Sequence, residues 1–177
     1  MDAFSGDIEK ILQLKSRRKI FEAVEKHAGS HFREIERRSG LPTGTVRHHL
    51  SYLAKHGLIS EQKDGNNVRY YPRAFDPGKK KLIGLLRQKT LRAIILTLLI
   101  HDNCNNDLLA RKAGISPSTA TWHMKKLEER GIIKSRREGR KTFYRLVPEK
   151  DAIIGLLIAY RESFLDSLVN NVIEMWG

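Results

Sequence analysis

The spacing of apolar residues near the start of the chain predicts two consecutive helices. Ile20, Phe21 and Val24 fall on one side of a helix that is expected to end near His27. A shorter helix follows and is expected to end at Gly40, because glycine readily adopts the left-handed conformation that closes a helix. The polar stretches after His27 and Gly40 mark these two ends.

The next thirty or so residues predict a third helix and a β-hairpin. Residues 41–43 (Leu-Pro-Thr) offer a hydroxyl N-cap beside a proline, so the third helix is expected from there to His56. Residues 59–63 and 68–71 flank Asp-Gly-Asn at 64–66, a composition typical of a hairpin turn. The unit therefore reads helix, short helix, tight turn, third helix, hairpin.

The same unit recurs 74 residues later, aligned without a gap from about residue 17 to residue 71. Apolar positions mostly meet apolar ones, which predicts a duplicated unit. In the second copy Ile-Ser-Pro-Ser at 115–118 precedes the third helix, and residues 133–137 and 142–146 form the hairpin. The identical pairs are Arg18/Arg92, Ile20/Ile94, His27/His101, Arg37/Arg111, Gly40/Gly114, Thr45/Thr119, His49/His123, Leu53/Leu127, Gly57/Gly131, Ile59/Ile133, Gly65/Gly139 and Tyr70/Tyr144.

A second repeat lies outside these units. Pro77 and Pro148 are each followed five residues later by a similar apolar segment, at 82–86 and 153–157, and residues 7–12 are a candidate third copy. The last segment continues as a predicted helix from about residue 151 to 176. We therefore expect a first domain at 1–76 with an N-terminal helix, a second at 77–149 with a linker helix, and a C-terminal helix within 150–177.

Charge extends this picture from fold to partner. The chain has 33 Lys and Arg against 20 Asp and Glu, a formal net charge of +13. Residues 150–177 carry two basic and four acidic side chains, so residues 1–149 hold +15. A surplus of this size attracts polyanions, of which nucleic acid is the commonest soluble one.

Cysteine content and hydropathy predict the compartment. Cys104 is the one cysteine in 177 residues, which excludes an intramolecular disulfide and fits a reducing environment. The first ten residues lack the basic and apolar regions of a secretory signal. The longest apolar run, residues 93–100, is far shorter than the roughly 20 residues of a membrane helix. We expect a cytoplasmic protein.

Both units contain the pattern G-[IL]-x-x-x-T-x-x-x-H-[LM]-x-x-L-x-x-x-G-[LI]-I, followed by a hairpin with G-x-x-x-x-Y. The chain resembles the ArsR/MarR-type superfamily of winged-helix transcription regulators, particularly its archaeal tandem members, over nearly its whole length. The resemblance implies a mainly α fold with small β-hairpin wings. It implies two tandem winged helix-turn-helix domains plus a long C-terminal helix, and a regulator that binds duplex DNA.

In that superfamily the third helix lies in the major groove, the second crosses the backbone, and the wing reaches phosphates or the minor groove. Carried over by position, the outward faces of the two third helices are the predicted recognition surfaces, while Val46, Leu50 and Leu53 face the first core and Ala120, Met124 and Leu127 the second. Arg47 is a candidate for a guanine edge, a phosphate contact or a solvated charge. The predicted contacts are Thr43, Thr45, Arg47, His48 and Ser51 in the first unit, and Ser118, Thr121, Trp122, Lys125 and Lys126 in the second.

The remaining predicted contacts are cations on the second helices and the wings. The second-helix cations either contact phosphates or lie on a solvated face of the helix. They are Arg33, Arg37 and Arg38 in the first unit, and Arg111 and Lys112 in the second. Wing one is nearly balanced in charge, and wing two is strongly basic, so wing two is expected to supply more electrostatic affinity. Wing one carries Lys63 and Arg69 against Glu61 and Asp64; wing two carries Lys134, Arg136, Arg137, Arg140, Lys141 and Arg145 against Glu138.

Trp122 is an unusual residue for an outward position, where its counterpart is His48. A tryptophan is costly to leave in water, so it should have a partner. That partner is either nucleic acid, as an unstacked base or a thymine methyl, or protein, as a neighbouring unit or the C-terminal helix.

His49, His123 and Cys104 invite a metal or redox interpretation. With one cysteine and no second thiol, we expect no metal and no cofactor, and we expect the two histidines to support helix packing. Cys104 is either a thiol of lowered pKa that senses oxidants or simply a neighbour of a helix cap.

Three functional hypotheses follow. A transcription regulator on duplex DNA leads, a single-strand-binding or chromatin-type protein comes second, and a winged-helix scaffold for protein interaction comes third. No phosphate loop, paired-carboxylate signature or nucleophile motif suggests an enzyme. The apolar side of the C-terminal helix predicts a homodimer, against the alternative of packing on the second domain; its members are Ile154, Leu157, Ile158, Leu165, Leu168, Val172 and Trp176.

Overall fold

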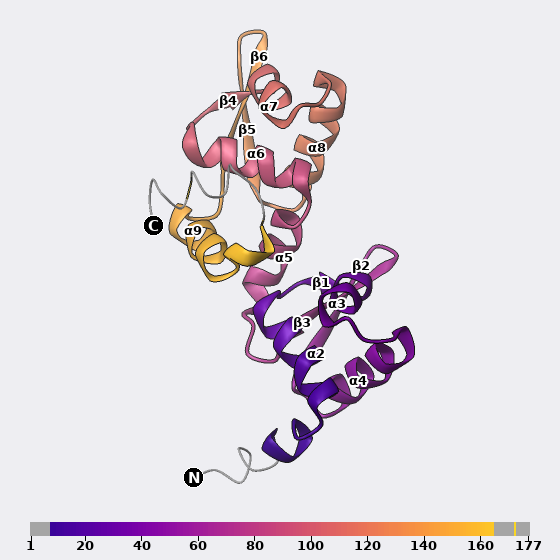
Figure 1. The fold of residues 1–177 in the computed structure, drawn as a ribbon. Helices are drawn as coiled ribbons and strands as arrows, with labels where there is room; N and C mark the ends of the chain where they lie inside the picture. The colour runs from indigo at the N-terminus through magenta and orange to yellow at the C-terminus, as the bar shows by residue number, and fades with distance from the viewer. Residues whose placement is uncertain (1–7, 165–171, 173–177) are drawn as a thin grey trace. The chain divides into compact units, whose positions relative to one another are not determined.

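The computed structural model describes residues 8–164 and Val172. The chain divides inside one helix into unit 1, Met1–Lys80, and unit 2, Lys81–Gly177. In chain order the helices and strands are α2 (Lys15–Lys26), β1 (Ser30–His31), α3 (Phe32–Ser39), α4 (Thr43–Lys55), β2 (Ile59–Asp64), β3 (Asn67–Pro72), α5 (Pro77–Leu86), α6 (Lys89–Ile100), β4 (Cys104–Asn105), α7 (Asn106–Ala113), α8 (Pro117–Glu129), β5 (Ile133–Glu138), β6 (Lys141–Leu146), α9 (Lys150–Ala159) and a 3-10 turn at Arg161–Ser163 (Figure 1).

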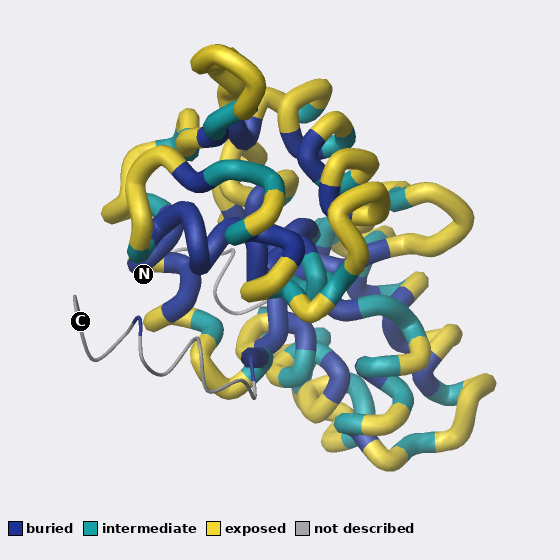
Figure 2. The backbone as a smooth tube through the Cα atoms, turned by 90° about the horizontal axis from the view of Figure 1, so that it is seen from above, coloured by how far each residue is buried: buried dark blue, intermediate teal, exposed yellow. Residues whose placement is uncertain are grey.

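The mainly helical fold with small hairpin wings agrees with the prediction, and the apolar stripes form the two cores. In unit 1, Ile20 and Val24 of α2 are fully buried against Ile35 of α3 and Val46 and Leu53 of α4. Burying a side chain of this kind contributes about 1.5–3 kcal/mol. Figure 2 shows how buried and exposed stretches of the backbone alternate along the chain.

The helix ends agree with the glycine prediction, but the two N-caps differ. Gly40 ends α3 at φ 62° and Gly114 ends α7 at φ 65°, both left-handed. Ser116 caps α8, accepting a hydrogen bond from the backbone N–H of Thr119 at 3.2 Å. In unit 1 the N-cap of α4 is Pro42, with no side-chain cap. The predicted hydroxyl N-cap is therefore confirmed in unit 2 and wrong in unit 1.

Each hairpin belongs to a three-stranded antiparallel sheet, in the orders β1-β3-β2 and β4-β6-β5. The third strands, β1 and β4, have two residues each and were not predicted. The loops are two residues shorter than predicted, because Asp64 pairs with Asn67 and leaves a two-residue turn at Gly65 and Asn66. Glu138 pairs with Lys141 in the same way.

The helices that precede α2 and α6 are also related by the spacing of 74 residues. Residues 8–11 are helical, and Ile8, Ile11 and Leu12 pack on the core of unit 1. Arg18 donates to the carbonyl of Leu12 at 3.0 Å, and Arg92 donates to that of Leu86 at 2.7 Å. This shared contact supports the prediction that residues 7–12 copy the linker helix α5.

The C-terminal helix is shorter than predicted. α9 ends at Ala159, and a 3-10 turn leads to Phe164, which is 2% exposed. The guanidinium carbon of Arg92 lies 5.6 Å from the centre of the Phe164 ring. Because burial of this ring is favourable, it favours a change of chain direction over continuation of the helix. Ile158 of the predicted apolar side is 48% exposed. Apart from Val172, which is buried, the predicted helix beyond residue 164 lies outside the described residues.

Candidate nucleic-acid interface

In unit 1 the third helix, α4, separates its polar and apolar sides as predicted. Val46, Leu50 and Leu53 are buried, and the predicted contact residues lie on the opposite side. Arg47 rests over the ring of Phe32 from α3, with its guanidinium carbon 5.3 Å from the ring centre. Of the predicted contacts on α4, Thr43, Arg47, His48 and Ser51 are exposed and Thr45 is partly exposed.

The basic surface of α3 in unit 1 is largely engaged by acidic residues of the same helix. Glu36 accepts hydrogen bonds from Arg33 at 2.9 Å and from the hydroxyl of Thr43. These bonds hold the pKa of Glu36 below its usual value. Arg38 pairs with Glu34 at 3.0 Å. Arg33 is well exposed, so its pair is screened by water, whereas Arg38 is only partly exposed.

Arg37 differs from the other two arginines of α3. It is exposed and has no ion-pair partner among the residues that the structure describes. Arg111, its counterpart on α7, is likewise exposed, as is Lys112. These three cations are the second-helix groups best placed for a phosphate.

In unit 2 the helix α8 presents a different surface. Asn106 replaces Phe32, and its side-chain amide donates to the hydroxyl of Thr121, the counterpart of Arg47, at 3.2 Å. The same amide donates to the carbonyl of Pro117 at 3.0 Å, while its Oδ1 atom is buried without a hydrogen-bond partner. Asn106 thus fixes the first turn of α8, a role that sequence patterns did not indicate. Its position after the Asn105 N-cap was the available signal.

Trp122 is exposed on α8. Its side of the helix is opposite the buried Ala120, Met124 and Leu127, as predicted, and the residue remains 58% exposed. The ring of His123 meets its ring edge-on at 4.8 Å, and the amine of Lys126 lies 5.1 Å from the ring centre. Ser118, Thr121 and Lys125 are exposed around it, and Lys126 is partly exposed.

Arg69 does not belong to an interface, which corrects the prediction for wing one. It is 4% exposed and forms an ion pair with Asp64 at 2.6 Å. It also donates to the carbonyl of Gly29 at 2.8 Å. The sequence pattern correctly placed Arg69 on the hairpin. It did not show that Arg69 is bound by Gly29, which lies 40 residues earlier in the chain. Lys63 remains exposed on this wing.

Wing two keeps its cations on the surface. A single acidic residue, Glu138, pairs with Arg136 at 3.2 Å, and both side chains are well exposed. Pairs of this kind contribute little because water screens them. Lys134, Arg136, Arg137, Arg140, Lys141 and Arg145 are all exposed.

Of the two shared histidines, His49 is buried and His123 is partly exposed. His49 is 4% exposed, and its Nε2 shares a hydrogen bond with the hydroxyl of Ser16 at 2.9 Å. Burial lowers the pKa of His49, with Arg17 and His48 adding to the effect. Burial also lowers the pKa of His123, helped by Lys126. The contact of His49 with α2 supports the predicted packing role.

Cys104 is 1% exposed in β4, and its thiol donates to the carbonyl of His101 at 3.1 Å. Burial raises its pKa, and Asp102 adds to this. The alternative of a reactive thiol with a lowered pKa is therefore wrong. Within residues 8–164 and at Val172, no group of three or more His, Cys, Asp or Glu is placed to hold a metal ion. No helix in the described part of the chain has the length and apolar character needed to cross a membrane.

Two helix-turn-helix motifs, each followed by a hairpin wing, define the class: the chain is a tandem winged helix-turn-helix protein. Residues 14–83 match a family of N-terminal helix-turn-helix domains, and residues 87–134 match the winged helix-turn-helix DNA-binding family. The domains are thus of the kind found in DNA-binding transcription regulators.

A relative from Methanocaldococcus jannaschii, an uncharacterized HTH-type transcriptional regulator, is 32% identical over 138 residues. The match covers 78% of the chain and 35% of that relative, so the chain spans about a third of its length. A structure of a predicted DNA-binding transcriptional regulator from E. coli matches with 22% identity and a TM-score of 0.38, covering 47% of the chain and 85% of the other. The structure of a Corynebacterium diphtheriae protein matches with 17% identity and a TM-score of 0.31, covering 75% of the chain and 26% of the other.

Proposed function

We propose that the protein regulates transcription by binding duplex DNA through both units, with α4 and α8 as the recognition helices. One observation carries this proposal. In each unit the third helix buries its apolar side and leaves a polar side exposed, and in unit 2 a hairpin follows whose inner side and tip carry exposed cations, Arg137, Arg140 and Lys141. A helix of this kind fits the major groove, and cations on a wing suit phosphates. We propose the cytoplasm as its location, and binding rather than catalysis as its activity.

The test is selection of bound fragments from random duplex and single-stranded pools, followed by affinity measurements on the selected duplex over a range of salt concentrations. The logarithm of the affinity should fall linearly with that of the salt concentration, with a slope of about −0.9 per neutralised phosphate. A flat salt dependence would refute the proposal and favour a protein-interaction scaffold.

Arg47→Ala separates base recognition from general attraction. Removing a hydrogen bond to a guanine edge should cost about 1–3 kcal/mol on the selected duplex and less on an unrelated one. Lys19→Ala is the matched control, since Lys19 is an exposed cation on α2 rather than on a recognition helix. Equal reductions in affinity from the two variants would mean that Arg47 acts only through its charge.

Single-strand binding is the second candidate, and the exposure of Trp122 favours it, because an accessible indole ring can stack on an unpaired base.

We also propose that the protein forms a homodimer. α9 carries the exposed Ile158, and the rest of the predicted dimer helix falls mostly outside the described residues. Sedimentation of the full chain and of a chain stopped after Phe164 tests it. A monomeric full chain would exclude the dimer.

A further inference from the structure

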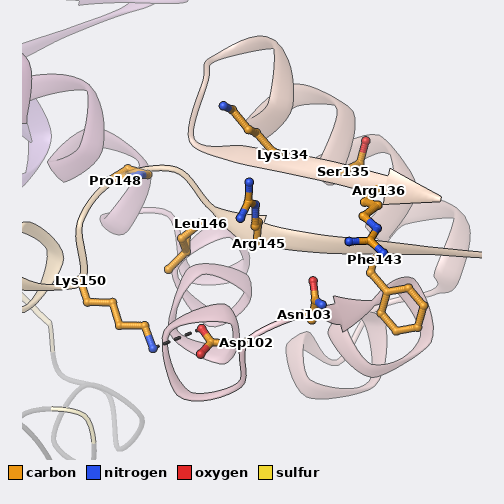
Figure 3. Close-up of a pocket in the computed structure, with 10 residues that line it drawn as sticks. All are labelled: Asp102, Asn103, Lys134, Ser135, Arg136, Phe143, Arg145, Leu146, Pro148 and Lys150. Atoms are coloured by element: carbon orange, nitrogen blue, oxygen red, sulfur yellow. Dashed lines mark ion pairs between the residues drawn. The ribbon is translucent and has the colours of Figure 1, made fainter. Parts of the chain in front are cut away.

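Unit 2 has a hollow on the side of its sheet that faces away from α8. The side chain of Ser135 donates to Glu128 of α8 at 2.6 Å, which identifies the inner side of β5. Because side chains alternate along a strand, Lys134 and Arg136 lie on the outer side. Phe143 and Arg145 of β6, which pair with Arg136 and Lys134, also line the hollow (Figure 3). Its volume is about 640 Å³. We call it the outer pocket.

The strand register concentrates positive charge in the outer pocket. Lys134 lies directly opposite Arg145, and Arg136 lies opposite Phe143. Like charges that face each other across two strands are destabilising. In the part of the chain that the structure describes, no carboxylate pairs with Lys134 or Arg145. The arrangement therefore lacks a counter-charge of its own.

Neither acidic residue nearby supplies that counter-charge. Asp102 is the one carboxylate among the described residues that line the pocket, and it pairs with Lys150 at 3.2 Å (Figure 3). Glu138 lies further along the hairpin and pairs with Arg136. The pocket therefore keeps an excess of positive charge beside the partly exposed ring of Phe143.

Unit 1 shows that the fold does not require this openness. Tyr71 stands in place of Arg145 and is 1% exposed, with its ring 5.3 Å from that of Phe75. The amine of Lys80 lies 5.1 Å from the centre of the Tyr71 ring and donates to Ser60, the counterpart of Lys134, at 2.9 Å. The chain's own side chains thus fill the surface that unit 2 leaves open.

We propose that the outer pocket binds a phosphorylated small molecule of the nucleotide type. Its phosphates would accept hydrogen bonds from Lys134, Arg136 and Arg145, and its ring would lie on Phe143. Guanidinium groups match phosphate oxygens in geometry and charge, and the volume falls in the range of small-molecule sites, about 300–1,000 Å³. The hollow shape, and its place on the side away from α8, favour a small ligand over the DNA backbone.

The experiment is calorimetric titration of the full chain with pyrophosphate and with ADP at constant ionic strength. The pocket variant is Lys134→Gln with Arg145→Gln. The matched control is Arg137→Gln with Arg140→Gln, which removes the same charge from the inner side and tip of the same hairpin. The pocket variant should bind both probes at least about tenfold more weakly, and the control should stay within about twofold of the wild type. Phe143→Ala should weaken ADP but not pyrophosphate.

Three outcomes would overturn the proposal: no binding of either probe by the wild type, equally weakened probe binding in the two double variants, or an equal fall of duplex affinity in both. The last would make the outer pocket a DNA phosphate contact. A wild type that binds ADP but no DNA would refute the proposed function alone. Loss of folding is controlled by melting temperature, which should stay level or rise in the pocket variant because a repulsion is removed.

Discussion

The two units share one sequence frame and one fold, but they use their charged side chains in opposite ways. Unit 1 engages two of its arginines internally, in the pairs of Arg38 with Glu34 and Arg69 with Asp64. In unit 2, Lys112 and Phe143 occupy the positions of Arg38 and Arg69, and the hairpin carries its cations outside. The two copies share most of their apolar positions and differ in many of their polar ones. Unit 2 should therefore dominate the attraction of polyanions.

The recognition helices differ as well, at the contact with the preceding helix. Arg47 lies over Phe32 in unit 1, and Thr121 accepts a hydrogen bond from Asn106 in unit 2. One unit presents a long guanidinium at this position and the other a short hydroxyl beside an exposed indole. Since groove readout depends on such groups, the two units are expected to prefer different sequences.

The largest expected effect concerns the wings. Replacing Arg137, Arg140 and Lys141 with Ala should lower the duplex affinity and reduce the salt slope by roughly 0.9 for each phosphate that these cations neutralise. Lys63→Ala in wing one should change both much less, since it removes one cation from a nearly neutral hairpin. Affinity measured at several salt concentrations checks this. Equal slopes for the two variants would end the claim that unit 2 dominates.

The next effect is on the stability of unit 1. Arg69→Ala removes a buried ion pair and a bond to the Gly29 carbonyl, so it should cost about 2 kcal/mol of unfolding free energy. Lys63→Ala on the same hairpin is the control and should stay within about 0.5 kcal/mol. Urea unfolding followed by circular dichroism measures both. A loss as small as the control's would show that Arg69 is as solvated as the sequence suggested.

Trp122 tests the difference between the recognition helices. If a base stacks on its ring, Trp122→Ala should weaken single-strand binding by about 1–3 kcal/mol and duplex binding by less. His48→Ala, its counterpart in unit 1, should have the smaller effect. Quenching of tryptophan fluorescence in a Trp176→Phe background reports the contact directly. A lowered melting temperature with both affinities intact would instead assign Trp122 to packing.

The features that sequence predicted are local ones. The apolar stripe of α2, the glycine ends of α3 and α7 and the two hairpins rest on residues within a few positions of each other, where periodicity and backbone preference decide. The inward and outward sides of α4 and α8 followed from the same periodicity. These elements therefore appear in the structure close to where they were expected.

The features that sequence missed depend on distant contacts. β1 and β4 are too short to show a pattern and exist because they pair with β3 and β6. Arg69 looked like a surface cation because its partner Gly29 is far away in sequence. The long C-terminal helix was wrong because Phe164 is buried and lies near Arg92. Charge counting found the cations of wing two but not the register that sets Lys134 opposite Arg145.

The smallest expected effect tests what the two units have in common, the shared histidine of the third helix. Burial lowers the pKa of both His49 and His123 below the value of about 6.5 expected in the unfolded chain. Well above pH 6.5 the imidazoles are neutral in both states and do not reduce the stability of the fold. As the pH falls below that value, the unfolded chain takes up protons that the folded chain resists, so stability is lost. His49→Gln should reduce the loss between about pH 7 and pH 5, and adding His123→Gln should reduce it further. Thermal melts across this range decide it. An unchanged pH dependence in the double variant would place its origin in other groups.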